Sequence, residues 1–445
     1  MSKTKRFLLY FVLLANLAAV LWFWYAQSGA MLWQGWSPSF LSLGRITGLL
    51  AVFFILFQIL LIGRVKWIER IFGMDKLSLL HHWVGVTVPV FIIAHPVFLA
   101  LSYSVRRSSG FWPQLFKLLF TNEDLLPATI ATILFLVVAV TSVIIVFSKK
   151  LKYEHWFFIH LTVYLAILWS FEHQLETGGD FRGILGNIFA GYWYALYFFT
   201  FANLIWYRFV KQLVFWQRHR FTVEEVVPEN SSVWSVYISG KNLDKFEFSP
   251  GQFAILRFLN KKGWWQAHPF SFSCCPNGNN LRFTIKNLGD FSGQVGTLAK
   301  RTPVLLDGPH GVFVPQRTSN NKLLLIAGGV GIAPIRSLLE YFHSSRDVVL
   351  LYGNRNQKDI IFEKELNDFA GEEVKIFQVL SDEPTWNGEK GRIDEEKIRR
   401  LAPDYLERDI FLCGPPAMMM AARQTLLKMG VKKDKIYFEK FSLGS

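Results

Sequence analysis

The sequence predicts a multidomain membrane protein with a six-helix transmembrane bundle, a small antiparallel β-barrel domain and a parallel α/β domain. The chain has 445 residues, of which 51% are hydrophobic, and it is too long for one ordinary domain. Almost all of its long apolar runs lie in the first half. Beyond them, short alternating runs, charged residues and Gly and Pro turns are typical of a soluble fold.

Six apolar runs are each long enough to cross a bilayer, which takes about 20 residues. The first follows SKTKR and has no small-residue cleavage site, so we interpret it as an uncleaved span. With the N-terminus in the cytoplasm, the inside segments hold twelve Lys and Arg residues and the outside segments five, which favours this orientation. An even number of spans then predicts a multi-pass protein of the inner (plasma) membrane with both termini cytoplasmic. The runs fall at 7–26, 44–63, 79–103, 125–147, 155–173 and 188–208.

The net charge of +14 comes mostly from this inside bias and from a scattered basic surface. We therefore expect the lipid bilayer as a partner, and not a nucleic acid. The three cysteines, Cys274, Cys275 and Cys413, show no CxxC spacing and lie in the half predicted to be cytoplasmic. Neither disulfides nor a zinc site are expected there.

Histidines interrupt two of the predicted spans, and imidazole is costly in hydrocarbon unless it is used there. His81 and His95 are 14 steps apart, which on a helix is about 21 Å and about 40° short of four turns. His160 and His173 are 13 steps apart, roughly 20 Å. The two spans run in the same direction, so His81 can pair with His160 and His95 with His173. Two such pairs predict bis-histidine ligation of two stacked haems.

Other assignments fit less well. A pairing that uses His155 mismatches the depths by roughly 6 Å, and His82 points about 140° away from His95. His160 and His173 are themselves about 140° apart on an ideal helix, so ligation by both needs a distorted turn or offset haem planes. The alternative is that these histidines form hydrogen bonds between helices or line a polar cavity.

The second half changes pattern. Alternating segments such as FTVEEVVPENSSVWSVYIS and LRFTIKNLGDFSGQV predict an antiparallel barrel over 217–316. Residues 320–445 alternate strands with helices, which predicts a parallel α/β domain. Within it, KLLLIAGGVGIAPIRSLL places a glycine turn between a strand and a helix. Such a turn lets backbone N–H groups approach a pyrophosphate, although ordinary strand–helix turns also use glycine. Residues 1–213 form the transmembrane domain in this interpretation.

HPFSFS, KNLGDFSG, DGPHG, GGVGIAPIRSLL and CGPPAMM occur in this order and resemble a ferredoxin-reductase-type flavoprotein module. Joined to a six-span domain with paired histidines, the chain resembles the ferric reductase / NADPH oxidase superfamily from about residue 41 to its end. The chain has no EF-hands or other added domains in this interpretation, and in this respect it resembles prokaryotic members. The resemblance implies FAD, two b-type haems and NADPH (or NADH) as cofactors.

The resemblance also implies residue roles. His268, Pro269, Phe270 and Ser271 match the stretch along the flavin and its ribityl chain. The alternative for His268 is an ordinary strand-end histidine. Lys286, Gly289 and Ser292 match the segment that holds the FAD pyrophosphate. Gly328, Gly329, Gly331 and Pro334 match the NAD(P) pyrophosphate turn.

Cys413, Gly414 and Pro415 match the loop beside the nicotinamide. Cys413 would position the nicotinamide by close packing, and its alternative is a buried small hydrophobe. A C-terminal aromatic residue often covers the flavin in this family, and Phe441 is the candidate here, with Phe438 second and core packing as the alternative. Arg355 follows the second strand of the α/β domain, where a cation can meet a 2′-phosphate. This favours NADPH over NADH.

These roles predict transmembrane electron transfer from cytoplasmic NAD(P)H, through FAD and two haems, to an acceptor outside. Oxygen, giving superoxide, and a ferric chelate are both compatible, and Arg45 near the outer end of the second span could meet a haem propionate or superoxide. Oxidases often carry a further histidine four residues past the outer ligand, where this chain has Leu99. An alternative is a reductase that feeds a periplasmic protein partner. A histidine-lined transporter is disfavoured by the second half.

Overall fold

The computed structural model describes residues 3–121, 123–148, 153–260 and 264–439. The chain folds into two compact units. The first comprises Met1–Val65 and Leu77–Ile205, and the second comprises Lys66–Lys76 and Trp206–Ser445. A short piece of chain from between two long helices therefore belongs to the second unit.

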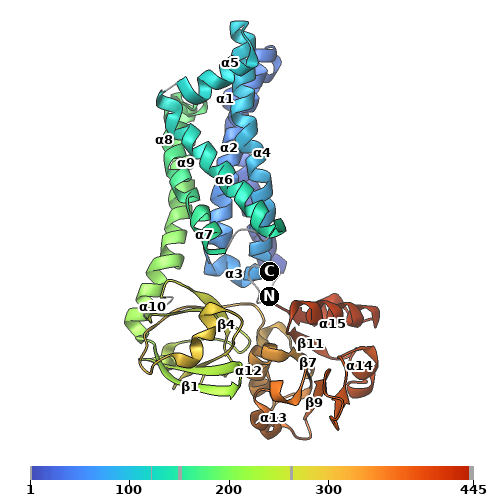
Figure 1. Ribbon diagram of the computed structural model, residues 1–445. Coiled ribbons are helices and arrows are strands. Elements are labelled where there is room, and N and C mark those ends of the chain that lie inside the picture. The colour runs from blue at the N-terminus through green and yellow to red at the C-terminus, as the bar shows by residue number, and fades with distance from the viewer. Residues whose placement is uncertain (1–2, 122, 149–152, 261–263, 440–445) are drawn as a thin grey trace. The chain divides into compact units, whose positions relative to one another are not determined.

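The first unit is a helical bundle (Figure 1). In the described part of the chain, five helices are long and apolar enough to cross a membrane, which confirms five of the six predicted spans. Their hydrophobic runs are nearly continuous, so each is helical along its whole length. These five helices are α1 (Lys3–Ser28), α2 (Trp36–Ile62), α4 (Met74–Arg107), α6 (Leu126–Ser148) and α9 (Gly183–Ile205).

The expected span at 155–173 is not confirmed as one long helix. It consists of two shorter helices, α7 (Tyr153–Leu161) and α8 (Val163–Glu176), which are separated by Thr162. The backbone N–H and the hydroxyl of Thr162 both donate to the carbonyl oxygen of Ile159, at 3.0 and 2.7 Å. This i→i−3 contact is that of a tighter helical turn, and the competing hydroxyl explains why the regular hydrogen-bond ladder stops here.

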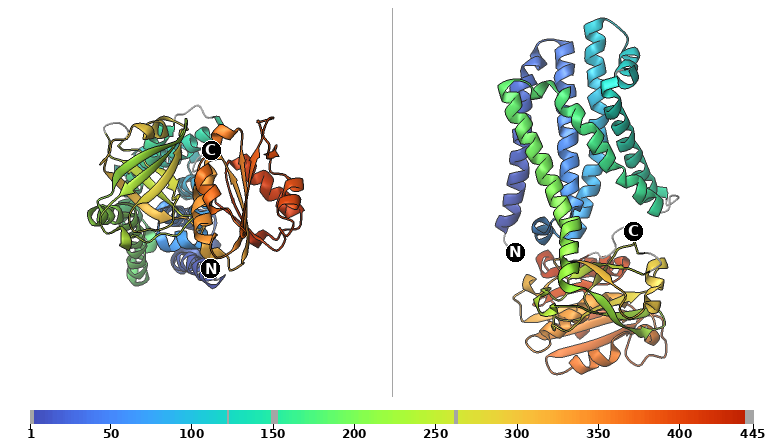
Figure 2. Two further views of the ribbon diagram at one scale, coloured as in Figure 1. Left: turned by 90° about the horizontal axis from the view of Figure 1, so that it is seen from below. Right: turned by 90° about the vertical axis from the view of Figure 1, so that its left-hand side faces the viewer.

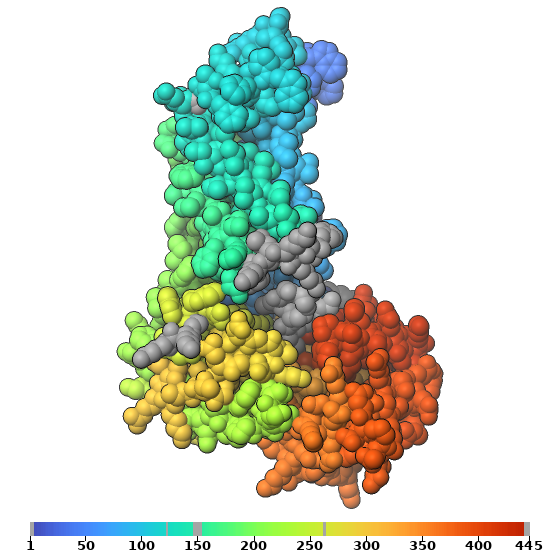
Figure 3. Space-filling view, viewed as in Figure 1, coloured from blue at the N-terminus to red at the C-terminus, as the bar shows by residue number. Residues whose placement is uncertain are grey.

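The surface of the first unit is rich in large apolar side chains. Trp83, Val90, Leu168 and Phe198 are each more than 60% exposed, an arrangement that suits contact with lipid and not with water. Figure 3 shows one face of this unit, on which the cyan to green segments that include α6 and α8 form the surface. Inside, Phe189 and Trp193 of α9 are fully buried among aromatic rings of α1 and the loop before α9.

The second unit begins with two three-stranded antiparallel sheets, of order β1-β2-β5 and β4-β3-β6. The alternating sequence lets each strand turn one face toward a shared core that includes Phe221, Phe272 and Phe283. Single bridges, Thr222 to Pro303 and Phe272 to Phe283, join the sheet edges, so the continuously bonded barrel that we expected is not confirmed. The strands are β1 (Thr222–Asn230), β2 (Val233–Ser239), β3 (Phe253–Phe258), β4 (His268–Ser271), β5 (Leu281–Lys286) and β6 (Val304–His310).

A six-stranded parallel sheet follows, of order β10-β9-β8-β7-β11-β12, and it confirms the predicted parallel α/β arrangement. One core lies between the sheet and helices α12 and α13, and another between the opposite face and α14 and α15 (Figure 2). The strands are β7 (Lys322–Gly328), β8 (Asp347–Asn354), β9 (Val374–Leu380), β10 (Glu389–Lys390), β11 (Asp409–Cys413) and β12 (Ile436–Phe438); the helices are α12 (Ile332–Phe342), α13 (Glu363–Phe369), α14 (Glu395–Leu401) and α15 (Pro416–Lys428).

Two short helices complete the second unit. Helix α3 (Lys66–Phe72) comes from the connection between α2 and α4, and α10 (Lys211–His219) continues the chain after α9. Both contact β6. The second unit thus contains both segments through which its chain is joined to long apolar helices.

Candidate functional site

The histidines of the first unit lie in two facing pairs. The ring centroids of His81 and His160 are 6.2 Å apart, and those of His95 and His173 are 6.4 Å apart. His81 and His95 lie on α4, His160 on α7 and His173 on α8. These are the two pairs that the helical spacing predicts.

The break at Thr162 explains how two histidines on opposite sides of an ideal helix can serve one partner helix. His160 precedes the break and His173 follows it. A tightened turn changes the angle between successive side chains around the helix axis. His173 on α8 can therefore point in a direction that it would not have on a continuous α-helix.

The Nδ1 atom of each of these four histidines has a polar neighbour, and each neighbour is a different residue. The partners are the carbonyl oxygens of Gln58 and Gly44 for His81 and His95, at 3.3 and 2.6 Å, and the hydroxyls of Ser142 and Thr177 for His160 and His173, at 3.5 and 2.9 Å. A carbonyl oxygen only accepts, so the Nδ1 atoms of His81 and His95 carry the proton. Their Nε2 atoms then keep a free lone pair for a metal.

Glycines on α2 bring this helix close to the His95–His173 pair. A Cβ atom on Gly48 would lie 2.8 Å from Nδ1 of His95, and one on Gly44 would lie 2.7 Å from a side-chain carbon of Leu99. Any larger residue at either position would push α4 away. The remaining histidines of this unit, His82 and His155, are exposed.

In the part of the chain that the structure describes, no group of three or more His, Cys, Asp or Glu side chains could hold a metal ion. The arrangement in the first unit is therefore one of facing pairs of imidazoles and not of a compact ligand cluster.

Arg45 of α2 is held by an acidic partner. Its Nη1 atom lies 3.3 Å from Oδ1 of Asp180 and donates to the Ser28 hydroxyl at 2.8 Å. Asp180 also accepts a hydrogen bond from Ser28. The guanidinium is thus oriented by two neighbours while 23% of the side chain stays exposed, which leaves some of its donors available for an anion.

The residues matched to the flavin lie on β4 and around the end of β5. His268, Pro269, Phe270 and Ser271 form β4, which pairs with β3 in its sheet. The His268 ring lies 4.3 Å from that of Phe291, centroid to centroid, and partial burial lowers the pKa of His268. His268 is therefore neutral near pH 7 and offers an apolar ring face to a planar ligand.

Lys286 ends β5, and the loop after it closes on itself. The Ser292 hydroxyl accepts from the backbone N–H groups of Leu288 and Gly289, at 2.8 and 3.1 Å. Nothing lies within 4 Å of a Cβ built on Gly289, so that glycine leaves open space beside the loop. Two of the three matched residues, Gly289 and Ser292, are thus in direct contact.

The two glycine motifs of the α/β domain meet at the carboxyl ends of β7 and β11. A Cβ atom on Gly331 would lie 2.6 Å from the carbonyl oxygen of Cys413, and one on Gly414 would lie 3.1 Å from the backbone nitrogen of Gly328. Gly329 has a φ of 53°, in the region that favours glycine. Helices from these two strands cover opposite faces of the sheet, so the motifs lie where ligands bind in open α/β sheets.

The other matched residues of this domain take different positions. Pro334 is buried in the first turn of α12, and Pro415 precedes α15. Arg355 is exposed just after β8. Cys413 is 2% exposed, and burial, then the charge of Glu439, raises the pKa of its thiol, so it does not act as a thiolate. Phe441 lies outside the described residues, and Phe438 lies on β12 beneath the Arg423 guanidinium.

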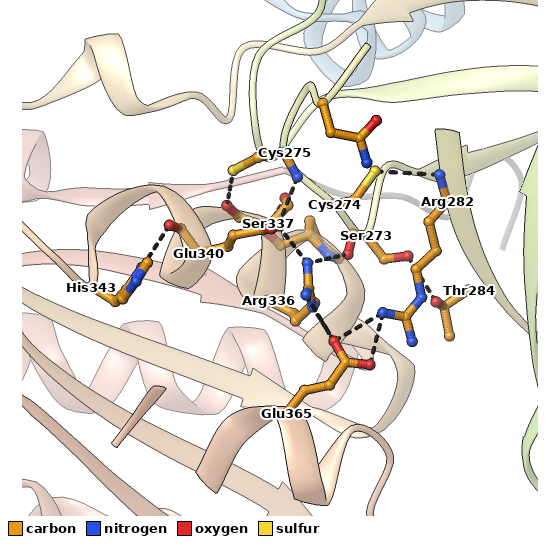
Figure 4. A network of polar contacts seen from close by, with 12 residues as sticks. Ser273, Cys274, Cys275, Arg282, Thr284, Arg336, Ser337, Glu340, His343 and Glu365 are labelled. Atoms are coloured by element: carbon orange, nitrogen blue, oxygen red, sulfur yellow. Dashed lines mark hydrogen bonds and ion pairs between the residues drawn. The ribbon is translucent and has the colours of Figure 1, made fainter. Parts of the chain in front are cut away.

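An ion-pair network that the sequence analysis did not predict joins the antiparallel sheets to the α/β domain (Figure 4). Glu365 of α13 accepts two hydrogen bonds from Arg282 of β5, at 2.8 and 2.9 Å, and one from Arg336 of α12, at 2.8 Å. Arg336 also donates to the carbonyl oxygen of Ser273, at 3.0 Å. Arg282 and Arg336 are 83 and 29 residues away from Glu365 in the sequence. No local sequence pattern therefore predicts these contacts. The network holds the antiparallel sheets and the α/β domain together.

Three family models match the chain in succession. The first, described as a ferric reductase like transmembrane component, matches residues 47–171. The second, an FAD-binding domain, matches 225–314. The third, an oxidoreductase NAD-binding domain, matches 325–424.

Curated relatives match the second half. The chain is 30% identical over 240 residues to a glycine betaine monooxygenase reductase subunit of Chromohalobacter salexigens, a match that covers 50% of this chain and 64% of the relative. It is 27% identical over 230 residues to a 3-ketosteroid-9-alpha-monooxygenase ferredoxin reductase component of Rhodococcus rhodochrous, with the same two shares. The chain thus spans less than two thirds of the length of these relatives.

Among solved structures, a ferredoxin reductase in carbazole 1,9a-dioxygenase matches with 24% identity and a TM-score of 0.45, over 50% of this chain and 68% of that one.

The order of the three family models is the decisive observation. A ferric reductase-like transmembrane component followed by FAD-binding and NAD-binding domains is the domain order of a ferric reductase / NADPH oxidase-type fusion protein, and the chain matches it.

Proposed function

We propose that this protein is a transmembrane oxidoreductase of the inner (plasma) membrane. It takes electrons from cytoplasmic NAD(P)H and delivers them, with FAD and two b-type haems as cofactors, to an acceptor on the other side. The observation that carries the proposal is the pair of facing imidazoles at each of two depths in the first unit.

The spacing within each pair fits an iron between the rings. An imidazole nitrogen lies about 2 Å from the metal it ligates and its ring centre roughly 1 Å further back, so two imidazoles that would hold one metal between them have centroids about 6 Å apart. The observed values are 6.2 and 6.4 Å. Because Nδ1 has a partner in all four rings, the donor set suits axial ligation through Nε2. His81 with His160, and His95 with His173, would hold the two haems.

When bound, FAD would accept a hydride and pass electrons on singly, which suits haem iron because it exchanges one electron at a time. The chain's own residues bind and orient these groups. β4 and the loop at Ser292 would contact the flavin. The glycine motifs of β7 and β11 would let the pyrophosphate of the nucleotide approach the backbone closely. Arg355 is exposed after β8 and would meet a 2′-phosphate, which supports NADPH as the donor.

The acceptor is oxygen, reduced to superoxide, or a ferric chelate. Arg45 keeps part of its guanidinium exposed beside Asp180, which suits an anion such as a haem propionate or superoxide. Leu99, and not a histidine, lies near the outer pair and packs against Gly44. Oxidases often carry a further histidine at this position, so its absence here favours the ferric chelate.

The test is a reoxidation experiment on the purified, FAD-loaded protein. We expect NADPH to reduce the haem without air, as seen in the haem absorption bands. The reduced protein is then mixed with oxygen or with ferric citrate. Fast reoxidation by oxygen with superoxide formed identifies an oxidase, and fast reoxidation by ferric citrate alone identifies a metalloreductase. If NADPH never reduces the haem, the proposed path is wrong.

The alternative is that the acceptor is a periplasmic protein. The curated relatives are named as reductase components and subunits of oxygenases, and such components serve a second protein. Slow reoxidation by both small acceptors, which becomes fast when a periplasmic extract is added, would favour this alternative.

A further inference from the structure

Helix α3, which comes from the connection between α2 and α4, is held at the end of β6 by a buried acidic residue. The Glu69 side chain is 1% exposed, and its Oε1 atom accepts a hydrogen bond from the backbone N–H of Gly311 at 2.7 Å. Its Oε2 atom lies 4.0 Å from Nδ1 of His310. A carboxylate buried in this way is costly unless a cation or donors face it.

His310 is the cation-forming group at this corner. It is fully buried, and its Nε2 atom lies 3.2 Å from Oδ1 of Asp307. Its Nδ1 atom has no hydrogen-bond partner among the described residues. If Nε2 carries the only proton, the lone pair of Nδ1 faces the Glu69 carboxylate, and the two repel each other. With both nitrogens protonated, the ring donates toward a carboxylate on each side.

The charged groups around His310 come from β6, α3, α10, the start of α4 and the segment after β12. Asp307 lies on β6 itself, and α3 brings Glu69 together with Lys66 and the exposed Arg70. From α10, Lys211 donates to the carbonyl oxygen of Gly308 at 3.4 Å, and Gln212 donates to Oδ2 of Asp307 at 3.2 Å. After β12, Glu439 is buried beside Gly311, and Asp75 at the start of α4 lies close to it.

The pKa directions agree with a protonated imidazole. Burial alone would lower the pKa of His310, but the carboxylates of Asp307 and Glu69 raise it above its ordinary value. Burial and the charges of Asp75 and Glu69 raise the pKa of Glu439 to about 8, so that group is neutral at pH 7. Burial and the Lys211 charge lower the pKa of Lys66 to about 8.

The residues around His310 contact both segments, α3 and α10, through which the chain of this unit continues into the long helices. β6 contacts α3 through Glu69 and α10 through Gln212. Met74, the first residue of α4, is buried against Phe253 and Ile255 of β3. His81, seven residues further along the same helix, is one of the paired histidines.

We propose that Glu69 and His310 form a proton-dependent clamp that holds α3 and the start of α4 on the FAD-binding domain. Through this clamp Glu69 is a positioning residue for electron delivery to the His81–His160 pair. The electron-delivery role rests on the proposed function, whereas the clamp itself does not. As pH rises and His310 loses its proton, Glu69 and Asp307 are left as unneutralised carboxylates, and α3 is released.

The test measures hydrogen–deuterium exchange of residues 66–76 in the full-length, cofactor-loaded protein in lipid nanodiscs, corrected for the intrinsic pH dependence of exchange. The variants are Glu69→Gln, His310→Gln and the double variant. Arg70→Gln, an exposed change on the same helix, is the matched control. The wild type should lose about tenfold in protection between pH 6.5 and pH 8.5, the size of one charge-assisted hydrogen bond.

Each single variant should already lose about tenfold at pH 6.5 and should lose clearly less than the wild type between pH 6.5 and pH 8.5, where Glu439 beside Gly311 still titrates. The double variant should lose no more than either single variant, because the two groups act as one unit. Equal protection of residues 66–76 in Glu69→Gln, His310→Gln and Arg70→Gln would overturn the clamp, and so would an unchanged pH dependence in His310→Gln.

Two activities separate positioning from general damage. NADPH-driven ferricyanide reduction at the flavin should stay within about twofold of wild type in Glu69→Gln, while anaerobic haem reduction slows about fivefold or more. An equal loss of both activities would overturn the positioning role. If wild-type NADPH does not reduce the haem at all, the proposed function fails and the positioning role with it, while the exchange measurements still decide the clamp.

Discussion

The Nδ1 atom of His95 lies 2.6 Å from the carbonyl oxygen of Gly44, on the neighbouring helix α2. Gly48, one turn further along α2, leaves the room that the same ring occupies. The outer histidine is thus set in place by a helix that carries no histidine of its own.

Gly48→Ala should therefore disturb the outer pair alone. The new Cβ atom would lie 2.8 Å from the His95 ring, and overpacking of this kind moves side chains from their positions. We expect the purified protein to lose about half of its haem, measured as extracted haem per protein. Gly191→Ala on α9, where nothing lies within 4 Å of the new atom, should keep full haem content; equal content in both variants would contradict the expected contact.

His81→Ala and His160→Ala should remove the same haem. Because both ligate one iron in our proposal, the double variant should retain as much haem as either single variant, about half of the wild-type amount. His81→Ala combined with His95→Ala should retain none. The exposed His82 provides the control, since His82→Ala should leave the haem content unchanged. Haem absorbance per protein decides among these results.

Gly331→Ala should weaken nucleotide binding. Its Cβ atom would lie 2.6 Å from the carbonyl oxygen of Cys413, so the two loops would have to separate at a cost of about 1–3 kcal/mol. The dissociation constant for NADP⁺, measured by calorimetry, should rise by about fivefold to 150-fold. Gly371→Ala, in open space, should bind as the wild type does, and unchanged binding by Gly331→Ala would show that the loops can adapt.

Removing the Glu365 carboxylate should loosen the contact between the antiparallel sheets and the α/β domain. Glu365→Gln leaves Arg282 and Arg336 without their shared anion. The free energy of unfolding should fall by at most about 1.5–3 kcal/mol, because water partly replaces the lost contacts at this partly exposed group. The thermal midpoint of the second unit should fall by several degrees. Glu363→Gln, exposed on the same helix, should shift it little, and an equal effect of both would argue against the network.

Stability should fall with rising pH because of Glu439. Folded Glu439 holds its proton up to about pH 8, whereas the unfolded side chain releases it near 4.5. The folded state thus binds more protons between these values, and its stability declines there by up to about 1.4 kcal/mol per pH unit. Thermal midpoints from pH 5 to pH 8 should decline less steeply in Glu439→Gln, and Glu372→Gln should follow the wild type; parallel slopes in all three would refute the shift.

The pairing of histidines could be derived from the sequence because a helix has a fixed rise and rotation. The same arithmetic showed that His160 and His173 are out of phase, but it could not say that Thr162 would be the residue at which the helix breaks. The Thr162 hydroxyl donates to the carbonyl oxygen of Ile159, but in the sequence Thr162 cannot be distinguished from any other threonine in a span.

The second unit divides in the same way. Strand alternation and glycine spacing are local, so they predicted the sheets and the turn at Gly331. The contacts of Glu69 with Gly311 and of Arg282 with Glu365 join residues 242 and 83 positions apart, and nothing near either residue announces its partner. Residues 66–76 looked only like a connection between two spans.

The contact between Glu69 and Gly311 also constrains how the protein is made. At about 5–20 residues per second, the ribosome reaches Gly311 on the order of 10–50 s after Glu69. During that time α2 and α4 can enter the membrane while the chain between them waits without its partner. A second half expressed alone from residue 206 would lack α3, and the Gly311 N–H would have to find water instead. Co-expression of the two halves, or a peptide of residues 66–76 added in trans, would then be the route to a complete soluble unit.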